Sequence, residues 1–523
     1  MDLDTVVFGG SIVSGEAGAN PKRADIGIAA GVIVGVGDLA HMPATERIDA
    51  SGLVVTPGFI DAHIHSEYAL LHGDPADRFG ALLQGVTSHA TAADGFGWAP
   101  SSQHLDGGPL WRSTTFAYGC ADLAPNWASP NEYLARFENC TPVNLIPFAP
   151  HQAIRYAAMG WRQGTPSLAE MGVQIGALRN WLDAGAFGLA TGLDYQPAAS
   201  ASTNEIVTLA QLVSDTGGVY APHIRYTQLG RVRAYEESIE IGRRARIPVA
   251  ICHEIVDDVT QPIIDGARNA GVDLTIDWYC YPAGCTTLLL TLHTDDYVGG
   301  PDAVAERLRD ASYRKRVASR MEDYILRPEE PGSSLYFADT RTGSHIGRTI
   351  PDIAHENGLS VGEMAVRLLE SELPDLALIY RRGISSEAFE NEVRRTVTHP
   401  AWSLTSDGFY HGQRPHPRGY GAFARFLRVV VRELNVLDLG EAVHRMSGAV
   451  AQRLRLKDRG YIRAGQAADL VALNPDTVSD RSTWEAPRMA PDGIEFVMVN
   501  GILAVKGGLP TGCLAGRVLY RDV

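Results

Sequence analysis

Residues 57–67 read Pro-Gly-Phe-Ile-Asp-Ala-His-Ile-His-Ser-Glu, and they contain the pair His63 and His65. The residues leading into this stretch, 53–60, are largely apolar and rich in β-branched side chains, which is typical of a buried strand. Side chains two positions apart on a strand point to the same face, so both imidazoles are expected to leave the strand end together. Such a pair is either half of a metal site or two histidines with ordinary structural partners. The rest of the chain decides between these interpretations.

Seven further segments have the composition of buried strands, and amphipathic helices are predicted between several of them. With 59–65, the predicted strands are 86–93, 143–150, 187–191, 219–224, 248–253, 272–279 and 402–407, and examples of the helices are 205–216, 236–245 and 260–270. Strands that alternate with helices imply a parallel sheet, and eight such units are what a (β/α)8 barrel needs. The predicted fold class is therefore α/β, with a (β/α)8 TIM-type barrel at its centre.

The two ends of the chain share one pattern. Residues 1–56 and 463–523 both contain short β-branched runs punctuated by glycine, which is typical of small β modules. Because chain termini commonly lie close together, we expect these segments to form one composite β-sandwich domain. The barrel then spans residues 57–462, with a charged, partly helical insertion at about 288–358. Long insertions on a barrel usually form lids or specificity loops.

Composition narrows the classes of partner. The chain has 523 residues and a net charge of −15, and an acidic surface argues against nucleic acid or an anionic membrane as the main partner. We expect neither a signal peptide nor a transmembrane helix, because no window approaches roughly 18 uninterrupted apolar residues. The six cysteines form no C-x-x-C motif, so a reducing cytoplasm is the simplest setting. A small molecule is the expected partner, and homo-oligomerisation is left open.

Metal-competent side chains recur where predicted strands end. The active site of a barrel of this type lies at the carboxyl ends of the strands. Besides His63 and His65, the side chains that close or follow a strand are Asp94, His223, His253 and Asp407. Random placement would rarely sort six such residues onto five strand ends, so the metal interpretation outweighs the structural one. Imidazole and carboxylate ligands suit one or two Zn²⁺ ions better than other divalent metals.

Asp407 is the predicted general base. A bound zinc ion lowers the pKa of its water to about 7 and polarises a carbonyl oxygen, so hydrolysis of an amide-like bond is the expected reaction. Asp407 would deprotonate the metal-bound water and then pass the proton to the leaving nitrogen. The alternative role for an aspartate in a Ser-Asp-Gly sequence is to cap a helix after the strand.

Short motifs extend along the chain and identify a family. They lie at residues 56–65 (Thr-Pro-Gly-Phe-Ile-Asp-Ala-His-Ile-His), 84–87, 190–195 (Ala-Thr-Gly-Leu-Asp-Tyr), 223–225, 281–284, 406–408, 416–421 (His-Pro-Arg-Gly-Tyr-Gly), 465–471 and 499–501. With these motifs the chain resembles the amidohydrolase superfamily and, within it, the N-acyl-D-amino-acid deacylase (D-aminoacylase) group. The resemblance runs nearly end to end, and it implies a barrel with a small β-sandwich that hydrolyses an amide.

The resemblance also implies how the ligands divide between two sites. A tightly held zinc would use His223 and His253, and a second, often weaker site would use His63, His65 and Asp407. Asp407 would be the catalytic acid and base.

Two further residues fall on active-site positions of the family. The resemblance implies that Tyr195 lies near the scissile carbonyl and that His151 lies at the pocket wall. Core packing is the alternative role for Tyr195, and a hydrogen bond at the barrel rim is the alternative for His151.

The chain departs from the family pattern at position 94. The deacylase group normally has a metal-ligating cysteine in an Asn-Cys-Gly-Phe context, whereas this chain has Ala-Asp-Gly-Phe, with Asp94. A carboxylate can still ligate or bridge zinc through its two oxygens, so Asp94 remains a predicted ligand. Its alternative role is to cap the loop.

The second departure concerns the substrate. The family typically has a lysine two residues beyond the sixth-strand histidine, where it pairs with the carboxylate of the N-acyl amino acid, and this chain has Ile255. Cys285 likewise stands where a small hydroxyl is usual. Arg225 could bind a carboxylate because its fork matches one geometrically, or it could form a structural salt bridge at the rim. Substrate identity is therefore less constrained than reaction class.

The leading prediction is a metal-dependent amidohydrolase that cleaves a C–N amide bond by attack of metal-bound hydroxide, by default an N-acyl-D-amino-acid deacylase. An alternative substrate is a cyclic amide, a carbamate or a modified natural product that lacks the usual carboxylate. A remote alternative is a non-catalytic scaffold of the same fold. That scaffold would have lost its ligands, yet the histidines and Asp407 are all present.

Overall fold

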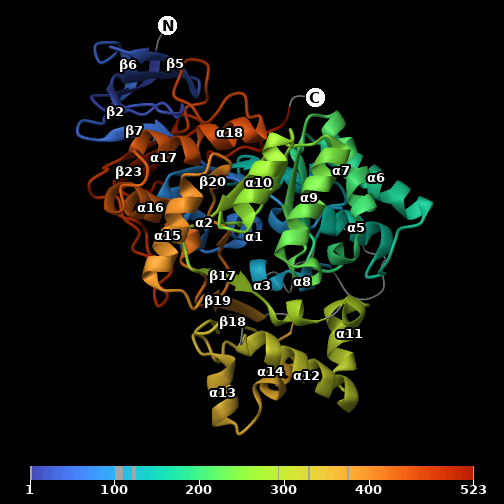
Figure 1. Ribbon diagram of the computed structural model, residues 1–523. Helices are drawn as coiled ribbons and strands as arrows, with labels where there is room; N and C mark the ends of the chain where they lie inside the picture. Colours follow the sequence, from blue (N-terminus) through green and yellow to red (C-terminus); the bar gives the residue numbers. More distant parts are fainter. Residues whose placement is uncertain are drawn as a thin grey trace.

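A ring of parallel strands forms the centre of the molecule (Figure 1). The computed structural model of the protein describes residues 3–100, 110–119, 125–292, 294–327, 330–373 and 376–521. The strands of the ring are β8 (Phe59–Asp61), β10 (Val86–Ala90), β11 (Asn144–Ile146), β12 (Ala149–Pro150), β13 (Gly188–Gly192), β14 (Val219–His223), β15 (Val249–Ile251), β16 (Leu274–Trp278) and β20 (Trp402–Leu404). They pair in this order, all in parallel, with β11 and β12 following each other in one strand position.

The ring closes between its first and last strands. The short strands β9 (Ile64–His65) and β21 (Gly408–Phe409) pair in parallel just beyond β8 and β20. The Asp407 amide donates to the His63 carbonyl at 2.9 Å. Eight strand positions therefore form a closed barrel within the described residues, which confirms the predicted fold class.

The first predicted strand, 59–65, is interrupted. Ala62 and His63 lie outside β8 and β9, because the buried Asp61 carboxylate accepts the His63 amide at 3.2 Å and turns the chain there. The same carboxylate accepts the Ser406 amide at 3.2 Å and so ties the first strand to the last. The two imidazoles therefore leave the barrel from a bend, and not from one continuous strand.

Helices cover the outside of the barrel because they are amphipathic. Those between strands are α6 (Leu168–Asp183), α7 (Thr203–Asp215), α9 (Arg231–Ala245), α10 (Thr260–Asn269), α15 (Ser386–Val397) and α17 (Leu439–Met446). In α7 the Ser202 hydroxyl accepts the Glu205 amide at 3.2 Å and caps the helix. Ile206, Leu209 and Val213 are buried at helical spacing, so this face packs onto the sheet.

Further helices lie at the ends of the strands and against the barrel. They are α1 (Glu67–His72), α2 (Pro75–Phe79), α3 (Thr115–Tyr118), α4 (Pro130–Leu134), α5 (His151–Met159), α8 (Tyr226–Leu229), α16 (Arg418–Phe426) and α18 (Gly448–Leu454).

Two sheets from the chain ends pack beside the barrel. One contains β5 (Val32–Gly37), β4 (Asp25–Ala29), β1 (Leu3–Phe8) and β6 (Ala44–Asp49), and the other contains β25 (Leu509–Pro510), β24 (Ile502–Lys506), β23 (Ile494–Val499), β22 (Leu470–Leu473), β7 (Val54–Pro57), β2 (Ser11–Ile12) and β3 (Lys22–Arg23). One apolar core joins Ile26 and Ile28 of the first sheet to Leu470 and Phe496 of the second. The domain boundaries at 56–57 and 462–463 stay a prediction.

A further segment stands between the seventh and eighth barrel strands. It contains a small antiparallel sheet of β17 (Ala283–Thr286), β19 (Leu376–Arg381) and β18 (Ser334–Thr340), with α11 (Gly300–Arg307), α12 (Ala311–Leu326), α13 (Ile350–Glu356) and α14 (Val361–Glu372). These elements extend beyond the predicted range of 288–358 on both sides. Figure 1 shows the segment, here called the insertion, projecting from the barrel on the side away from the N-terminal strands.

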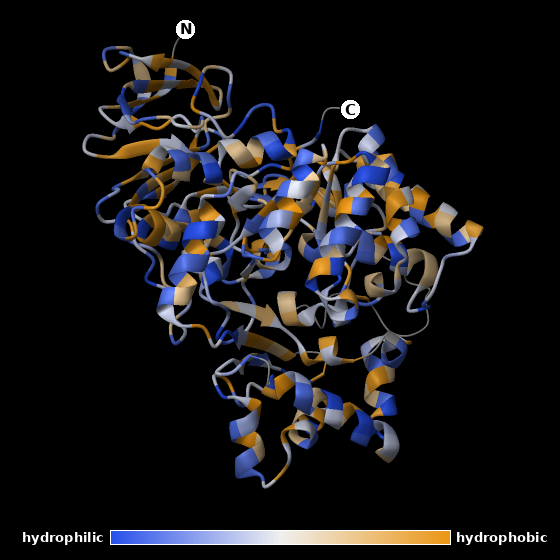
Figure 2. Cartoon of the chain, viewed as in Figure 1, coloured by the Kyte–Doolittle hydropathy of each residue, from blue (hydrophilic) through white to orange (hydrophobic). Residues whose placement is uncertain are grey.

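The insertion has an apolar core of its own. Val317 and Met321 of α12 pack with Leu368 and Leu369 of α14 in one buried cluster. Hydrophilic and hydrophobic residues alternate along these helices (Figure 2). Within the described residues, no helix combines the length and the apolarity that crossing a bilayer requires.

Candidate metal centre and active site

Six of the predicted ligands meet at the carboxyl end of the barrel. Each lies at or just past a strand of the ring, and the six are His63, His65, Asp94, His223, His253 and Asp407. Together they are called the candidate metal centre. They converge because parallel strands present their carboxyl ends at one rim of the barrel.

Asp94 lies at the middle of the candidate metal centre. Its Oδ1 atom is 3.4 Å from His63 Nε2, 3.5 Å from His223 Nδ1 and 3.4 Å from His253 Nε2. Its Oδ2 atom is 3.6 Å from His65 Nε2. One carboxylate therefore faces four imidazoles, those of His63 and His65 and those of His223 and His253.

Asp407 also faces the imidazoles of His63 and His65. Its Oδ1 atom lies 3.5 Å from His63 Nε2 and 3.4 Å from His65 Nε2. Its Oδ2 atom lies 2.7 Å from Nη2 of Arg418, a buried side chain on α16. The ion pair fixes one oxygen and leaves the other directed at the imidazoles.

Four buried atoms of the predicted ligands have no hydrogen-bond partner within the described residues. They are His63 Nε2, His65 Nε2, Asp94 Oδ1 and Asp407 Oδ1. Buried polar atoms are normally hydrogen-bonded, so four that face one another need a common partner. The donor atoms of His63, His65 and Asp407, and those of His63, Asp94 and His253, each lie within 4.8 Å of one another. This set of nitrogen and carboxylate donors fits a divalent cation.

Three of these residues hold an uncommon backbone conformation. The φ angles of Asp94, His253 and Asp407 are 54°, 42° and 46°. Non-glycine residues rarely adopt this left-handed region, and such strain gathers at functional sites. The left-handed conformation at these three residues directs their side chains toward the candidate metal centre, and it costs conformational free energy.

The charges of the centre are mutually dependent. Burial opposes ionisation of Asp94, but the charges of His223 and His63 hold its pKa well below the usual range. Burial also opposes protonation of His65, yet Asp407 and Asp94 raise its pKa to about 9. Asp94 and Asp407 thus favour a proton on His65, whereas burial lowers the pKa of His63.

Two imidazoles of the candidate metal centre each have a further partner on the side away from its carboxylates. His65 Nδ1 lies 3.3 Å from the Tyr118 hydroxyl, and His223 Nε2 lies 3.3 Å from Oδ2 of Asp194. Asp194 Oδ1 in turn accepts the Thr227 amide at 2.9 Å. Partners of this kind fix the ring orientation of a metal-ligating histidine. Neither Tyr118 nor Asp194 was predicted as a site residue, although Asp194 lies inside the Ala-Thr-Gly-Leu-Asp-Tyr motif.

Tyr195 lies between the centre and a cavity. Its ring centroid is 4.8 Å from that of His223 and 4.8 Å from that of Phe96. It also lines a cavity of about 490 Å³ whose far wall comes from the insertion. Of the predicted substrate-binding residues, it is the one that the structure places against both the centre and this cavity.

Arg225 and His151 belong to other networks. The Arg225 guanidinium donates through Nε to Glu237 at 3.1 Å and through Nη2 to the Ala201 carbonyl at 2.8 Å. Its Nη1 donates to the Ala199 carbonyl at 2.5 Å, so the whole fork is occupied at the barrel rim. His151 is fully buried at the start of α5, with Nε2 3.7 Å from Glu205 Oε1.

Ile255 and Cys285 are partly buried. Ile255 packs against the main apolar core, and its carbonyl accepts Arg231 Nη2 at 3.1 Å. Cys285 lies on β17, where burial raises the pKa of its thiol to about 12, so it stays protonated at neutral pH. Both positions are uncharged in the folded protein.

Known proteins resemble this chain along nearly its whole length. A family model described as amidohydrolase family matches residues 46–276 and 366–505. An N-acyl-D-glutamate deacylase from Alcaligenes xylosoxydans xylosoxydans is 32% identical over 529 residues, covering 99% of this chain and 97% of the relative. A D-aminoacylase from the same organism is 32% identical over 537 residues, covering 99% and 98%.

Solved structures of related enzymes also match nearly the whole chain. The structure of N-acyl-D-glutamate deacylase from Bordetella bronchiseptica, in complex with zinc and a phosphonate mimic of the tetrahedral intermediate, matches with a TM-score of 0.82 and 30% identity. The match covers 99% of this chain and 100% of that one. A D-hydantoinase structure, with a TM-score of 0.57 and 15% identity, shares the fold.

Proposed function

The chain belongs to the amidohydrolase family, in its D-aminoacylase group, and on that premise we propose that it hydrolyses the amide bond of an N-acyl-D-amino acid. It is a metal-dependent hydrolase of carbon–nitrogen bonds other than peptide bonds. The observation that carries the proposal is the meeting of four buried, unpartnered ligand atoms in a chain similar to deacylases from end to end. The products are a carboxylate and a free amine.

The proposed cofactor is zinc, as one or two ions. The donor set of four imidazoles and two carboxylates suits Zn²⁺, and Asp94 has oxygens directed at both groups of histidines. A zinc ion at this place supplies a water of lowered pKa and withdraws electron density from the amide carbonyl.

Asp407 is the proposed acid and base. Its Oδ2 atom is held by Arg418 at 2.7 Å, so Oδ1 is the oxygen that can accept a proton. The Asp407 carboxylate takes a proton as water adds to the carbonyl carbon, and it returns the proton to nitrogen as the C–N bond breaks. Arg418 orients the carboxylate and keeps it ionised between turnovers.

The substrate carboxylate needs a cation, and Arg418 is the proposed one. Ile255 carries no charge, and the fork of Arg225 is filled by Glu237 and two carbonyls. Within the described residues, Arg418 Nε and Nη1 form no hydrogen bond although both are buried. An arginine with unpaired N–H groups beside the acid and base suits a carboxylate next to the scissile amide.

Ile255 also favours a second candidate substrate. An apolar residue at the position of the family lysine fits an amide that lacks the usual carboxylate, such as a lactam or a carbamate. The two candidates share the candidate metal centre and differ only in what lies beside the scissile bond. Activity toward each class therefore distinguishes them.

We also propose a cytoplasmic location. The described cysteines, Cys140, Cys252, Cys280, Cys285 and Cys513, are all unpaired, as expected in a reducing compartment. A small-molecule amide is the proposed partner.

The experiment that tests the function is a substrate panel with defined metals. We expect the zinc-loaded protein to hydrolyse N-acyl-D-amino acids in preference to their L-enantiomers, and a chelator to abolish the activity until zinc is restored. Lactams and carbamates in the same panel test the second candidate. Hydrolysis that continues unchanged in the metal-free protein would overturn the mechanism.

A further inference from the structure

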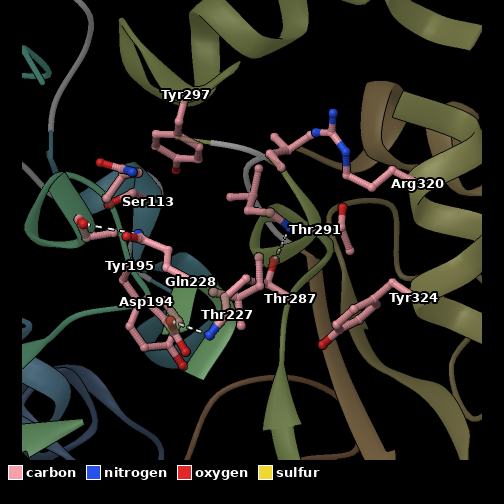
Figure 3. A pocket seen from close by; sticks show the side chains of 15 residues that line it. Ser113, Asp194, Tyr195, Thr227, Gln228, Thr287, Thr291, Tyr297, Arg320 and Tyr324 are labelled. Carbon is pink, nitrogen blue, oxygen red and sulfur yellow. Dashed lines mark hydrogen bonds between the residues drawn. The ribbon is translucent and has the colours of Figure 1, made fainter. Parts of the chain in front are cut away.

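His253 reaches the candidate metal centre from an uncommon backbone conformation. It lies two residues past the end of β15, and its φ angle is 42°. The left-handed region is unfavourable for a residue other than glycine, so neighbouring groups have to hold the chain there. His223 differs, because its ring has a partner in Asp194, which Figure 3 shows accepting the Thr227 amide.

Asp277, a buried residue of the neighbouring strand β16, is bonded to the backbone on both sides of this turn. Its Oδ1 atom accepts the His253 amide at 2.9 Å, and its backbone carbonyl accepts the Glu254 amide at 2.7 Å. The same Oδ1 atom accepts the Thr405 hydroxyl at 3.2 Å, two residues before Asp407. One side chain therefore connects the turn at His253 to the strand end that carries Asp407.

Both oxygens of the Asp277 carboxylate are engaged, unlike those of the two predicted carboxylate ligands. Its Oδ2 atom lies 3.4 Å from Nη2 of Arg453, and Nη1 of the same guanidinium donates to the Ser403 hydroxyl at 2.9 Å. Asp94 and Asp407 each have one buried oxygen without a hydrogen-bond partner within the described residues. The contacts of Asp277 thus suit a supporting role, and those of Asp94 and Asp407 suit ligation.

Direct ligation is the alternative role for Asp277. Ligand atoms of His63, Cys252 and Asp277 lie within 4.8 Å of one another. A cation bound to Oδ2 would lie beside the Arg453 guanidinium, whose positive charge opposes it, and Oδ1 already accepts two hydrogen bonds. The supporting role therefore fits the contacts better.

We propose that Asp277 is a positioning residue: its hydrogen bond to the His253 amide fixes the turn from which the His253 imidazole faces Asp94. Without this acceptor the turn can relax toward a more favourable conformation, and the imidazole loses its orientation. Groups that orient a metal-ligating histidine contribute to metal affinity, so the effect appears in zinc binding. The inference rests on the proposed function for its consequence in catalysis.

The test compares two double variants that both lack the ion pair with Arg453. Asp277→Asn/Arg453→Met keeps an amide oxygen that can accept the His253 amide, whereas Asp277→Leu/Arg453→Met has a side chain of nearly the same shape and no acceptor. Competition with a chromogenic chelator measures zinc affinity. We expect the leucine variant to bind zinc at least about tenfold more weakly than the wild type, and the asparagine variant to remain within about threefold.

Circular dichroism of the metal-free proteins establishes that each variant folds, and Asp277→Ala/Arg453→Met replaces the leucine variant if that one does not. Arg382→Met/Glu392→Gln is the matched control, because it removes a partly buried ion pair on α15, outside the barrel, and should leave zinc affinity unchanged. Wild-type affinity in the variant without an acceptor would overturn the proposal. So would an equal loss in both kinds of variant, which would assign the effect to the ion pair, or a fold that neither the leucine nor the alanine variant attains.

Zinc affinity separates this inference from the proposed function. In the substrate panel, the leucine variant should have a lower kcat than the asparagine variant toward any N-acyl-D-amino acid that the wild type hydrolyses. If the wild type hydrolyses none of them, the proposed function fails. The zinc affinities of the two variants, which require no substrate, still support or overturn the role of Asp277.

Discussion

Two groups of buried charges lie at the carboxyl end of the barrel, and they are built in opposite ways. In the candidate metal centre, carboxylates and imidazoles face one another with four unpartnered atoms. In the second group, here called the salt-bridge cluster, Arg155 binds the Glu205 carboxylate through Nη1 while His151 lies beside it. Arg155 Nη2 donates to the Gly164 carbonyl at 2.8 Å.

The two groups differ in the role that their residues suit: the candidate metal centre suits catalysis, and the salt-bridge cluster suits stabilisation of the fold. The salt-bridge cluster contains its own cation, because Arg155 pairs with the Glu205 carboxylate, although Arg155 Nε and both ring nitrogens of His151 form no hydrogen bond within the described residues. The candidate metal centre has an excess of donor atoms directed at an interior space. Histidine and acidic residues at strand ends therefore do not by themselves mark an active site; imidazole nitrogens and carboxylate oxygens from several strands that face one another do.

The largest expected effect is on catalysis at the candidate metal centre. Asp407→Asn removes the proton acceptor but keeps the side-chain volume, so kcat should fall by at least about 10³-fold. Folding and most of the bound zinc should be retained, which circular dichroism and elemental analysis can establish. A rate within a few-fold of the wild type would reject the role of Asp407.

The next largest effect is on stability at the salt-bridge cluster. Glu205→Gln leaves the Arg155 charge buried and unpaired, which should lower the free energy of unfolding by about 3–5 kcal/mol. Chemical denaturation measures this loss. Glu240→Gln, which breaks an exposed pair with Arg243, is the matched control and should cost less than about 1 kcal/mol. Equal losses in the two variants would contradict the comparison.

The same cluster should make stability depend on pH. Burial opposes ionisation of Glu205, but His151 and Arg155 lower its pKa from 4.5 to about 2. A carboxyl with a lowered folded-state pKa stabilises the protein above its unfolded value, so this contribution should be present above pH 4.5 and lost as the pH falls toward 2.

The expected size of that contribution is on the order of 3 kcal/mol. Denaturation curves of wild type and Glu205→Gln at pH 5 and pH 3 measure it as a difference that shrinks at the lower pH. A difference that stays constant with pH would show that folding does not lower the pKa of Glu205.

The smallest of these effects concerns metal affinity. Asp94→Ala removes the carboxylate whose oxygens face both groups of histidines, so zinc affinity should fall at least about tenfold. Competition with a chromogenic chelator measures it. Unchanged zinc stoichiometry and affinity in this variant would show that Asp94 does not bind the metal, and its alternative role as a loop cap would remain.

The sequence predicted the barrel and the convergence of the six candidate ligands, because both follow from the order of residues within each strand and just past its end. A buried parallel strand shows as an apolar run, and the residues just past its carboxyl end must lie at the active end of the barrel. His223 and His253 illustrate this, since each lies within one or two residues of the end of its strand. The interruption at Ala62 was missed because it depends on the Asp61 carboxylate, which bonds to distant Ser406.

The partners of Arg225 and His151 could not be predicted from the sequence, because they depend on the paths of loops and helices. Arg225 was a candidate for binding a carboxylate, but two carbonyls and Glu237 occupy its guanidinium. His151 directly follows β12, at a strand end like that of His223 on β14, yet it lies against Glu205. In both cases the partner is brought in by a loop or helix whose position no local pattern encodes.

The closure of the barrel has a consequence for how the protein is made. β9 pairs with β21, so the ligands at residues 63 and 65 meet Asp407 only when the two ends of the ring join. A ribosome releases the first histidines long before it synthesises that aspartate. The complete centre is therefore a late product of translation, and contacts so distant in sequence form slowly. Full occupancy by zinc would then report that the whole barrel has been synthesised and closed.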